Sequence, residues 1–306
     1  MKILITGGAG FIGSHIADAY LRAGHDVVIA DNFGTASEKN VPPRARLHRV
    51  DIRDLSLLRR VFEAERPDLV NHHAAIASVA HSLRDPTPTM DTNVMGTLNV
   101  AFLSSEFGVR KLLFASTGGV IYGDPPRLDL PVSESYPRNP LSPYALSKVL
   151  AEDIIKFYAS RGGFSFLVFR YANVYGPRQN PKGEAGVIAI FSELMREETR
   201  PTIFGDGSKT RDYVYVDDIV SANLLALERG ENEVLNIGLG KEITDDRVFQ
   251  LVADEIEYKG NPNYAPFREG ENLRISLDAS RAEKILGWKP KISLEEGVRR
   301  TLRVKS

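Results

Sequence analysis

The sequence predicts an α/β fold built on a doubly wound parallel sheet, with a smaller C-terminal lobe interleaved with it. Short apolar runs alternate with amphipathic helical segments through the first half of the chain, and a glycine-rich turn joins the first run to the first helix. After about Tyr171 the alternation gives way to shorter elements. Strands separated by helices form right-handed crossovers and therefore parallel sheets.

The first elements are the clearest. Residues 2–6 form a continuous apolar run typical of a buried parallel strand. Residues 11–23 are predicted to be a helix with Ile12, Ile16, Ala19 and Tyr20 on one face, ended by Gly24. Residues 26–30 form the next strand, which leads into Asp31.

The same alternation continues along the chain. We expect strands at 47–50, 69–72, 111–116 and 165–170, and helices at 55–65, 88–107 and 143–160. Further on, strands are expected at 213–216 and 234–237, with satellite helices at 244–257 and 293–304. We therefore expect a dinucleotide-binding domain over 1–171 and a substrate lobe over 172–306, with segments near 213–237 returning to the first domain.

Composition excludes several classes of protein. The 306 residues include 39 basic and 40 acidic side chains, a net charge of -1 that argues against a nucleic-acid or anionic-lipid partner. The absence of cysteine excludes a disulfide framework, a thiolate metal site and a cysteine nucleophile. No apolar run approaches the roughly 18 residues of a membrane span, and the N-terminus lacks a secretory signal. We expect a cytoplasmic protein without a bound metal.

The turn at residues 6–13 has the pattern Gly7-x-x-Gly10-x-x-Gly13 between a strand and a helix. A tight turn, a close backbone approach to a pyrophosphate and close helix–strand packing each favour glycine, and the free N–H groups of the helix then face the phosphates. The pattern is weak alone, but its place after the first strand predicts a Rossmann-type dinucleotide site. Asp31 ends the second strand, where a carboxylate binds a ribose 2′-hydroxyl and so favours NAD over NADP.

Tyr144 and Lys148 are spaced to share one helix face. A free tyrosine has a pKa near 10, and bringing it to about 7 takes roughly 4 kcal/mol. An ammonium about 4 Å away supplies roughly that much at an effective dielectric constant near 20. The pair is therefore a candidate general acid and base, and the hydroxyls of Ser116 and Thr117, at a strand end, are candidates to bind a substrate hydroxyl.

Other polar residues have plainer interpretations. His72 and His73 lack a third metal ligand at a recognisable spacing and are interpreted as strand-end residues. Asp217 and Asp218 are predicted to cap a helix. Asn93, taken alone, is interpreted as a polar residue on a helix surface.

Taken together, the chain resembles the extended short-chain dehydrogenase/reductase family over nearly its whole length, and within it the nucleotide-sugar 4-epimerases. The matching segments are Gly7–His15, Asp51–Asp54, His73–Ala75, Asn93–Thr97, Ser116–Thr117, Ser142–Lys148, Arg170–Arg178 and Arg211–Asp218. The resemblance implies a tightly held NAD and a UDP-hexose substrate.

The resemblance also implies which residues bind each group. For the cofactor they are Gly7, Gly10, Phe11, Ile12, Gly13, Asp31, Asn32, Asp51, Ile52, Ala74, Ala75, Asn93, Ser116, Tyr144, Lys148 and Tyr171. For the nucleotide sugar they are Thr117, Tyr144, Asn173, Val187, Thr202, Phe204, Arg211, Arg268, Glu271 and Ile275. Thr117 matches the catalytic hydroxyl, with Ser116 as the alternative, and Ile275 matches the position that gates the pocket around the sugar C2 substituent.

The implied reaction is interconversion of UDP-glucose and UDP-galactose. Tyr144 takes the 4-hydroxyl proton while C4 gives a hydride to NAD, the 4-keto sugar turns over, and the hydride returns to its other face. An epimerase of N-acetylhexosamine or uronic-acid nucleotides and a decarboxylase stay open as alternatives. A 4,6-dehydratase is disfavoured, because such enzymes place Asp-Glu where this chain has Gly118-Gly119. A non-catalytic NAD-binding regulator is the alternative of another class. The resemblance also implies a homodimer through the helices at 88–107 and 143–160.

Overall fold

The computed structural model describes residues 1–182 and 186–303. Its main sheet has seven strands in the order β11-β6-β5-β4-β1-β2-β3, and every neighbouring pair is parallel. These strands are β1 Lys2–Thr6, β2 Asp26–Asp31, β3 Arg46–Arg49, β4 Leu69–His72, β5 Lys111–Thr117, β6 Ser165–Tyr171 and β11 Glu233–Ile237. The predicted doubly wound parallel sheet is confirmed.

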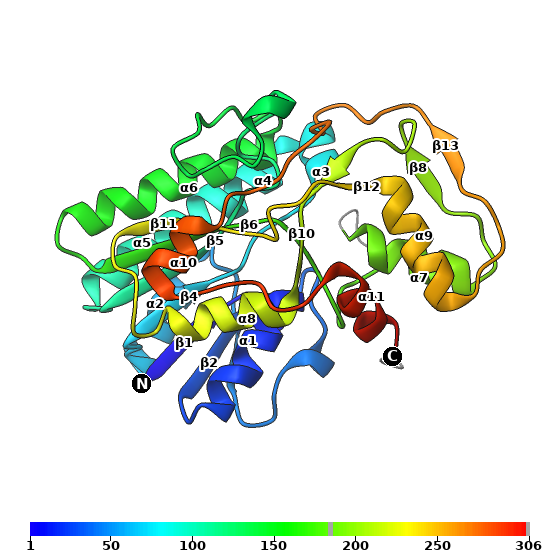
Figure 1. Ribbon diagram of the computed structural model, residues 1–306. Coiled ribbons are helices and arrows are strands. Elements are labelled where there is room, and N and C mark those ends of the chain that lie inside the picture. The colour runs from blue at the N-terminus through cyan, green and yellow to red at the C-terminus, as the bar shows by residue number, and fades with distance from the viewer. Residues whose placement is uncertain (183–185, 304–306) are drawn as a thin grey trace.

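Helices cover both faces of this sheet (Figure 1). On one face, α1 (Phe11–Arg22), α8 (Val216–Leu225) and α10 (Ser280–Leu286) pack over a core that includes Ile5 and Leu167. On the other face, α2 (Leu55–Glu65), α5 (Gly96–Glu106) and α6 (Pro143–Ser160) enclose a second core. The apolar runs on the central strands are buried from both sides, which is why they lack a polar alternation.

The helix expected over 88–107 is interrupted. After α3 (Val79–Arg84), the chain forms α4 (Pro86–Met90), a π-helical turn over Asp91–Met95 and then α5. Gly96 follows the turn, and a Cβ there would lie 2.7 Å from Ile52 Cγ1. Single π turns of this kind are often found at functional sites.

The remaining elements form a lobe at one end of the sheet, where Figure 1 shows α7, α9, α11, β8 and β13 together. Its strands are β7 Asn173–Tyr175, β8 Thr202–Phe204, β9 Thr210–Arg211, β10 Tyr213–Tyr215, β12 Ile243–Thr244 and β13 Asn263–Ala265, and its helices are α7 Val187–Arg196, α9 Asp245–Ile256 and α11 Leu294–Arg303. Outside this lobe, short 3₁₀ turns lie at Glu38–Asn40 and Arg127–Asp129. Strand β10 pairs with β7 outside the main sheet, whereas β11 joins the main sheet. Val304, the last residue of the helix expected over 293–304, lies outside the described residues.

Asp218 corrects one sequence-based prediction. Its carboxylate does not cap α8; it accepts hydrogen bonds from the main-chain N–H groups of Lys291 (3.0 Å) and Ile292 (3.1 Å). Its carbonyl oxygen accepts from Trp288 Nε1 at 2.9 Å. The residue therefore ties the C-terminal segment to α8, a contact about 70 residues away in sequence that local capping rules do not anticipate.

The sheet order places the candidate site. Strand β1 lies between β2 and β4, so the chain turns in opposite directions on its two sides. In open α/β sheets, ligands bind outside the carboxyl ends of the strands at such a switch point. Register brings Thr6 beside His72 and Thr117 beside Tyr171 at this edge.

Candidate active site

Two glycines of the turn after β1 are required by the fold itself. Gly7 has a positive φ of 70°, and a Cβ there would lie 2.6 Å from the main-chain nitrogen of Ala74. At Gly13 a Cβ would approach the carbonyl oxygen of Gly7 even more closely. Both positions are backbone-to-backbone contacts that no side chain fits.

Gly10 has a different environment. A Cβ there would meet only the Gly7 carbonyl oxygen, at 3.2 Å, and φ is -73°, which any residue adopts. Gly10 is the N-cap of α1, and no side chain caps that helix. Bare N–H groups at the start of a 12-residue helix, beside Phe11 and Ile12, form a cradle suited to a pyrophosphate. The residues present therefore fit a dinucleotide.

Acidic and amide side chains line the adjacent edge of the sheet. Asp31 is buried and accepts hydrogen bonds from the main-chain N–H groups of Ala9 (3.0 Å) and Phe33 (2.8 Å), which fixes β2 to the glycine turn. Asn32 Nδ2 donates to Asp51 Oδ2 at 2.9 Å. Hydrogen bonds from Arg53 lower the pKa of Asp51 to about 2. Ile52 is buried beside Gly96, and Ala74 lies against Gly7.

Thr117, Tyr144 and Lys148 meet at the carboxyl ends of β5 and β6. Burial raises the pKa of Tyr144 to about 12, and a hydrogen bond with Thr117 opposes that rise. Lys148 Nζ donates to the carbonyl oxygen of Ala115 at 2.8 Å and lies 4.8 Å from the centre of the Phe114 ring. Burial lowers the pKa of Lys148 to about 8.

One part of the sequence interpretation is corrected here. We expected the Lys148 ammonium to lower the pKa of Tyr144 by about 3, and the pKa of Tyr144 in this structure is instead raised. Burial is the larger cause of this shift, and the ammonium itself donates to the Ala115 carbonyl oxygen beside the Phe114 ring. The two strand-end hydroxyls differ in their partners: Ser116 Oγ donates to Glu152 Oε1 at 2.6 Å, whereas the Thr117 hydroxyl is hydrogen-bonded to Tyr144, and Thr117 as the catalytic hydroxyl stays a prediction.

Asn93 corrects a second interpretation. It is 2% exposed rather than on a surface. Its Oδ1 accepts from the main-chain nitrogen of Ile76, and its Nδ2 donates to Ile76 O and to Ser147 Oγ. Asn93 therefore joins the π turn to the segment after β4 and to α6. An isolated asparagine in a helical pattern carries no local signal of such a role.

His72, the last residue of β4, and His73, the residue after it, differ in the hydrogen-bond partners of their rings. His72 Nδ1 lies 2.6 Å from Thr6 Oγ1 and its Nε2 lies 2.9 Å from Thr97 Oγ1, so its role is structural. Both ring nitrogens of His73 are buried without a hydrogen-bond partner among the described residues. Burial, with Lys148 nearby, lowers the pKa of His73 to about 3, so the ring is neutral. The described part of the chain contains no cluster of His, Cys, Asp or Glu arranged to hold a metal ion.

Tyr171 closes the edge on the β6 side. Its hydroxyl accepts a hydrogen bond from Asn223 Nδ2 at 2.8 Å, and its ring stacks on Phe169 at a centroid distance of 5.6 Å. The His73 ring lies 6.2 Å from it, measured between ring centroids. Tyr171 therefore forms a fixed apolar wall, with its polar atom directed away into the core.

Several residues predicted for the nucleotide sugar form a cluster in the C-terminal lobe. The Arg268 guanidinium lies 3.6 Å from the centre of the Phe204 ring. Glu271 lies 3.8 Å from Arg211 and 3.9 Å from Arg268. Sequence reasoning missed Lys209, whose Nζ contacts Glu271 at 2.6 Å and Asp245 at 3.3 Å. No motif marks a lysine whose partners are 36 and 62 residues away.

The other predicted substrate residues lie at separate places. Asn173 begins β7, Val187 begins α7 and Thr202 begins β8. Ile275 is 1% exposed and belongs to the core cluster that contains Val132 and Leu277. Its place at the sugar pocket stays a prediction.

Gly118 and Gly119 are also closely packed. A Cβ at Gly118 would lie 3.0 Å from the Arg170 carbonyl oxygen, in addition to contacts with Leu277. A Cβ at Gly119 would lie 2.9 Å from Asn173 Oδ1. Side chains at these two positions would therefore require Leu277 and Asn173 to move, and the two glycines carry no group that could transfer the protons of a dehydratase.

The dinucleotide-type turn and the Thr117–Tyr144–Lys148 set define a hydride-transfer enzyme on a Rossmann-type fold. The model of the NAD dependent epimerase/dehydratase family matches residues 3–238, and the chain belongs to this family. NAD is therefore its cofactor.

Comparison with individual proteins shows which members of this family the chain is similar to. A putative UDP-glucose 4-epimerase of Methanocaldococcus jannaschii is 46% identical over 300 residues, covering 98% of this chain and 97% of the relative. A UDP-glucose 4-epimerase of Thermotoga maritima, solved with UDP-glucose, superposes with a TM-score of 0.96 at 45% identity, covering 99% of this chain and 97% of that one. A Thermus thermophilus UDP-glucose 4-epimerase in complex with NAD gives a TM-score of 0.94 at 41% identity, covering 99% and 98%.

Proposed function

We propose that this protein interconverts UDP-glucose and UDP-galactose with NAD as a cofactor that is not consumed. The observation that carries the proposal is the Thr117–Tyr144–Lys148 set at the carboxyl edge of the sheet, beside the Gly10 cradle. When bound, NAD accepts a hydride from the sugar C4 and returns it. The protein supplies binding, orientation and proton transfer.

The residues proposed to hold NAD lie around the switch point. The Gly7–Gly13 turn and the first turn of α1 face the pyrophosphate, Asp31 and Asn32 the adenosine ribose, and Asp51 and Ile52 the adenine. Ala74, Ala75, Asn93, Ser116 and Tyr171 form the remaining border. For Asn93 and Ser116 the side chains bond within the protein, so these two residues support the site through their packing.

Tyr144 is the proposed acid and base. It takes the proton of the sugar 4-hydroxyl and later returns one, while Thr117 hydrogen-bonds to both the phenol and the sugar. Because burial raises the pKa of Tyr144, the phenolate needs positive charge near it. The Lys148 ammonium is the protein group available for this purpose, and its lowered pKa makes its charge sensitive to pH near 8.

The C-terminal cluster is proposed to hold the nucleotide. Arg211 and Arg268 suit a diphosphate, because a guanidinium donates two parallel hydrogen bonds. Phe204 offers an apolar ring for the base, and Glu271 offers a carboxylate for the ribose. Asn173, Val187, Thr202 and Ile275 complete the proposed pocket.

Product analysis tests the proposal. Purified protein is incubated in parallel with UDP-glucose, UDP-N-acetylglucosamine and UDP-glucuronate, and each product is identified by chromatography and NMR. We expect UDP-galactose from UDP-glucose at the highest rate. Conversion of only the N-acetylated or the uronic substrate would assign the chain to those epimerases, and loss of carbon dioxide would identify a decarboxylase. No turnover and no transient NADH absorbance with any substrate would favour a regulator.

The cofactor preference has its own test. The protein as purified should release NAD or NADH on denaturation, because the buried Asp31 carboxylate disfavours a 2′-phosphate. Recovery of mainly NADP(H) would show that Asp31 does not face the ribose.

We also propose a homodimer through the face formed by α5 and α6. Val94, Leu98, Leu150, Ile154, Phe157 and Tyr158 line an apolar groove there, and Phe157 is 56% exposed. Light scattering should give twice the chain mass, and Phe157→Glu should give the monomer. None of the described helices combines the length and apolar character that a bilayer crossing requires, and a cytoplasmic location stays a prediction.

A further inference from the structure

A buried carboxylate lies directly behind the catalytic residues. Glu152 is on α6, one helical turn after Lys148, and is fully buried. Its Oε1 accepts from Ser116 Oγ at 2.6 Å and from Arg170 Nε at 2.9 Å, and its Oε2 accepts from Arg170 Nη2 at 2.7 Å. One side chain thus joins the end of β5, the end of β6 and the helix that carries Tyr144 and Lys148.

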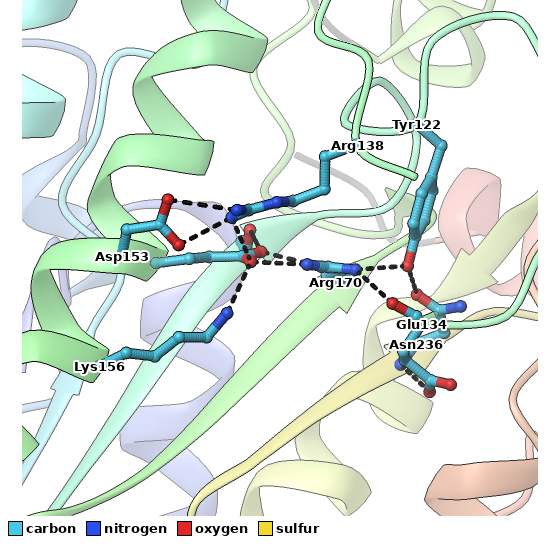
Figure 2. Close-up of polar contacts among 9 residues, drawn as sticks. Tyr122, Glu134, Arg138, Asp153, Lys156, Arg170 and Asn236 are labelled. Carbon is cyan, nitrogen blue, oxygen red and sulfur yellow. Dashed lines mark hydrogen bonds and ion pairs between the residues drawn. The ribbon is translucent and has the colours of Figure 1, made fainter. Parts of the chain in front are cut away.

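Glu152 is the centre of a larger network, and Figure 2 labels its members Arg138, Lys156 and Arg170. Arg138 Nη1 and Lys156 Nζ each lie 3.7 Å from its Oε2, and Asp153 holds Arg138 at 2.9 Å. On the other side, Arg170 Nη1 donates to the Tyr122 hydroxyl at 2.9 Å and to the Glu134 carbonyl oxygen at 3.2 Å. The Tyr122 hydroxyl donates in turn to Asn236 Oδ1 at 2.7 Å.

Hydrogen bonding to Ser116 restricts the strand end that carries Thr117. Ser116 and Thr117 are adjacent, and their side chains point to opposite sides of β5, as neighbouring residues of a strand do. One hydroxyl is held by Glu152 and the other is joined to Tyr144. Because the Glu152 carboxylate is held in turn by the two parallel bonds of Arg170, this contact adds to the Lys148–Ala115 hydrogen bond in fixing the end of β5 against α6.

We propose that Glu152 is a positioning residue of the active site: its carboxylate holds Ser116, and through it Thr117, against α6, and its negative charge acts on the Lys148 ammonium one helical turn away. This inference rests on the proposed function, because it assigns a role toward Tyr144 chemistry.

The charged and titratable groups around Lys148 support the second part. His72 and His73 face it from β4, and both are neutral because burial lowers their pKa. Tyr144 shares its helix face, and β5 contributes only the Ala115 carbonyl oxygen and the Phe114 ring. Glu152 raises the pKa of Lys148 against the effect of burial. Around Glu152 itself the cations are Arg170, Arg138 and Lys156.

The first experiment compares Glu152→Gln with Asp153→Asn. Both variants remove one negative charge from neighbouring residues of α6, but Asp153 is half exposed and has its ion pair with Arg138, at the outer side of the helix. The rate of UDP-glucose epimerisation is measured from pH 6 to 10. Losing the Glu152 charge lowers the pKa of Lys148, so the alkaline loss of activity should move to lower pH by about one unit. Asp153→Asn should retain the wild-type profile.

The second experiment isolates the hydrogen bond to the strand end. Ser116→Ala keeps every charge and should lower kcat about tenfold, through misplacement of Thr117. KM for UDP-glucose and the pH at which activity is lost should not change. This variant also decides the first part of the proposal if Glu152→Gln fails to fold.

Two results would overturn the proposal. If Glu152→Gln folds and loses activity at the same alkaline pH as the wild type, the Glu152 charge does not act on Lys148. If Ser116→Ala has the wild-type kcat, the hydrogen bond between Ser116 and Glu152 does not position Thr117. Failure of the proposed function is a separate result, because wild-type protein would then lack epimerase activity.

Discussion

The turn after β1 and the cation cluster of the C-terminal lobe are two binding regions built in contrasting ways. The turn uses main-chain groups from one short segment, and Gly7 and Gly13 touch backbone that cannot move aside. The cluster uses side chains brought from β8, β9 and the loop around Glu271, held by ion pairs at 2.6–3.9 Å.

The two regions therefore differ in how far a substitution can weaken ligand binding without also lowering the stability of the fold. A change in the turn affects the fold wherever backbone meets backbone, and affects only the cofactor where the backbone faces open space. A change in the cluster should act on the nucleotide sugar with little effect on the fold. Substitutions at Gly10, Gly13 and Arg211 test that distinction, and substitutions at Tyr144 and Ile275 test the acid–base residue and the sugar pocket that the two regions flank.

Gly13→Ala and Gly10→Ala should differ sharply. At Gly13 the added Cβ overlaps the Gly7 carbonyl, so we expect a loss of about 2 kcal/mol or more in the free energy of unfolding. At Gly10 the added Cβ meets only the Gly7 carbonyl oxygen, at 3.2 Å, which has to shift by a few tenths of an ångström, so the variant should lose much less stability than Gly13→Ala but purify with little NAD. Thermal unfolding and cofactor release measure both effects. Equal destabilisation by the two substitutions would contradict the division of roles.

Tyr144→Phe should lower kcat by about 10²- to 10⁴-fold, because it removes only the phenol oxygen that transfers the proton. The ring still packs, so NAD content and melting temperature should match the wild type. Steady-state epimerisation, with cofactor release as the control, is the measurement. Near-normal turnover would remove Tyr144 from the acid–base role.

Arg211→Lys tests the cluster. The substitution keeps the charge but loses the forked donor geometry, so KM for UDP-glucose should rise about tenfold while kcat changes little. Arg211 is 8% exposed. Arg247→Lys, at a pair with Glu295 on the surface, is the matched control and should change neither constant. A fall in kcat at constant KM would place Arg211 at the reacting end of the substrate.

Ile275→Val should have the smallest effect. The residue is in the core, so a glycine there would confuse pocket size with loss of stability, whereas valine should cost only about 1 kcal/mol. If Ile275 gates the pocket, activity on UDP-N-acetylglucosamine should rise relative to UDP-glucose by no more than about tenfold. An unchanged ratio of the two activities would mean that Ile275 packs the core without contacting the sugar.

Site residues that belong to local sequence patterns could be predicted, whereas those whose partners lie far away in sequence could not. The glycine spacing, the placement of Asp31 after β2 and the Tyr144–Lys148 spacing are local patterns, and the strands and helices that carry them were predicted within a few residues. Asn93 was interpreted as exposed and the helix around it as continuous, because nothing local records that its amide bonds the main chain of Ile76. Asp218 was assigned to a cap for the same reason.

The sequence by itself determined the α/β class and the dinucleotide-type turn, and it predicts the Tyr144–Lys148 pair, because each depends on residues within a few positions of one another and on backbone geometry that the residue type dictates. Tertiary structure decided which hydroxyl meets Tyr144, where the Lys148 ammonium points and which cations surround Glu271. Those outcomes depend on burial and on partners tens of residues away, such as Lys209 with Glu271 and Ser116 with Glu152. The charge state of a buried side chain is set by the groups that packing brings to it, and spacing along the chain does not encode them.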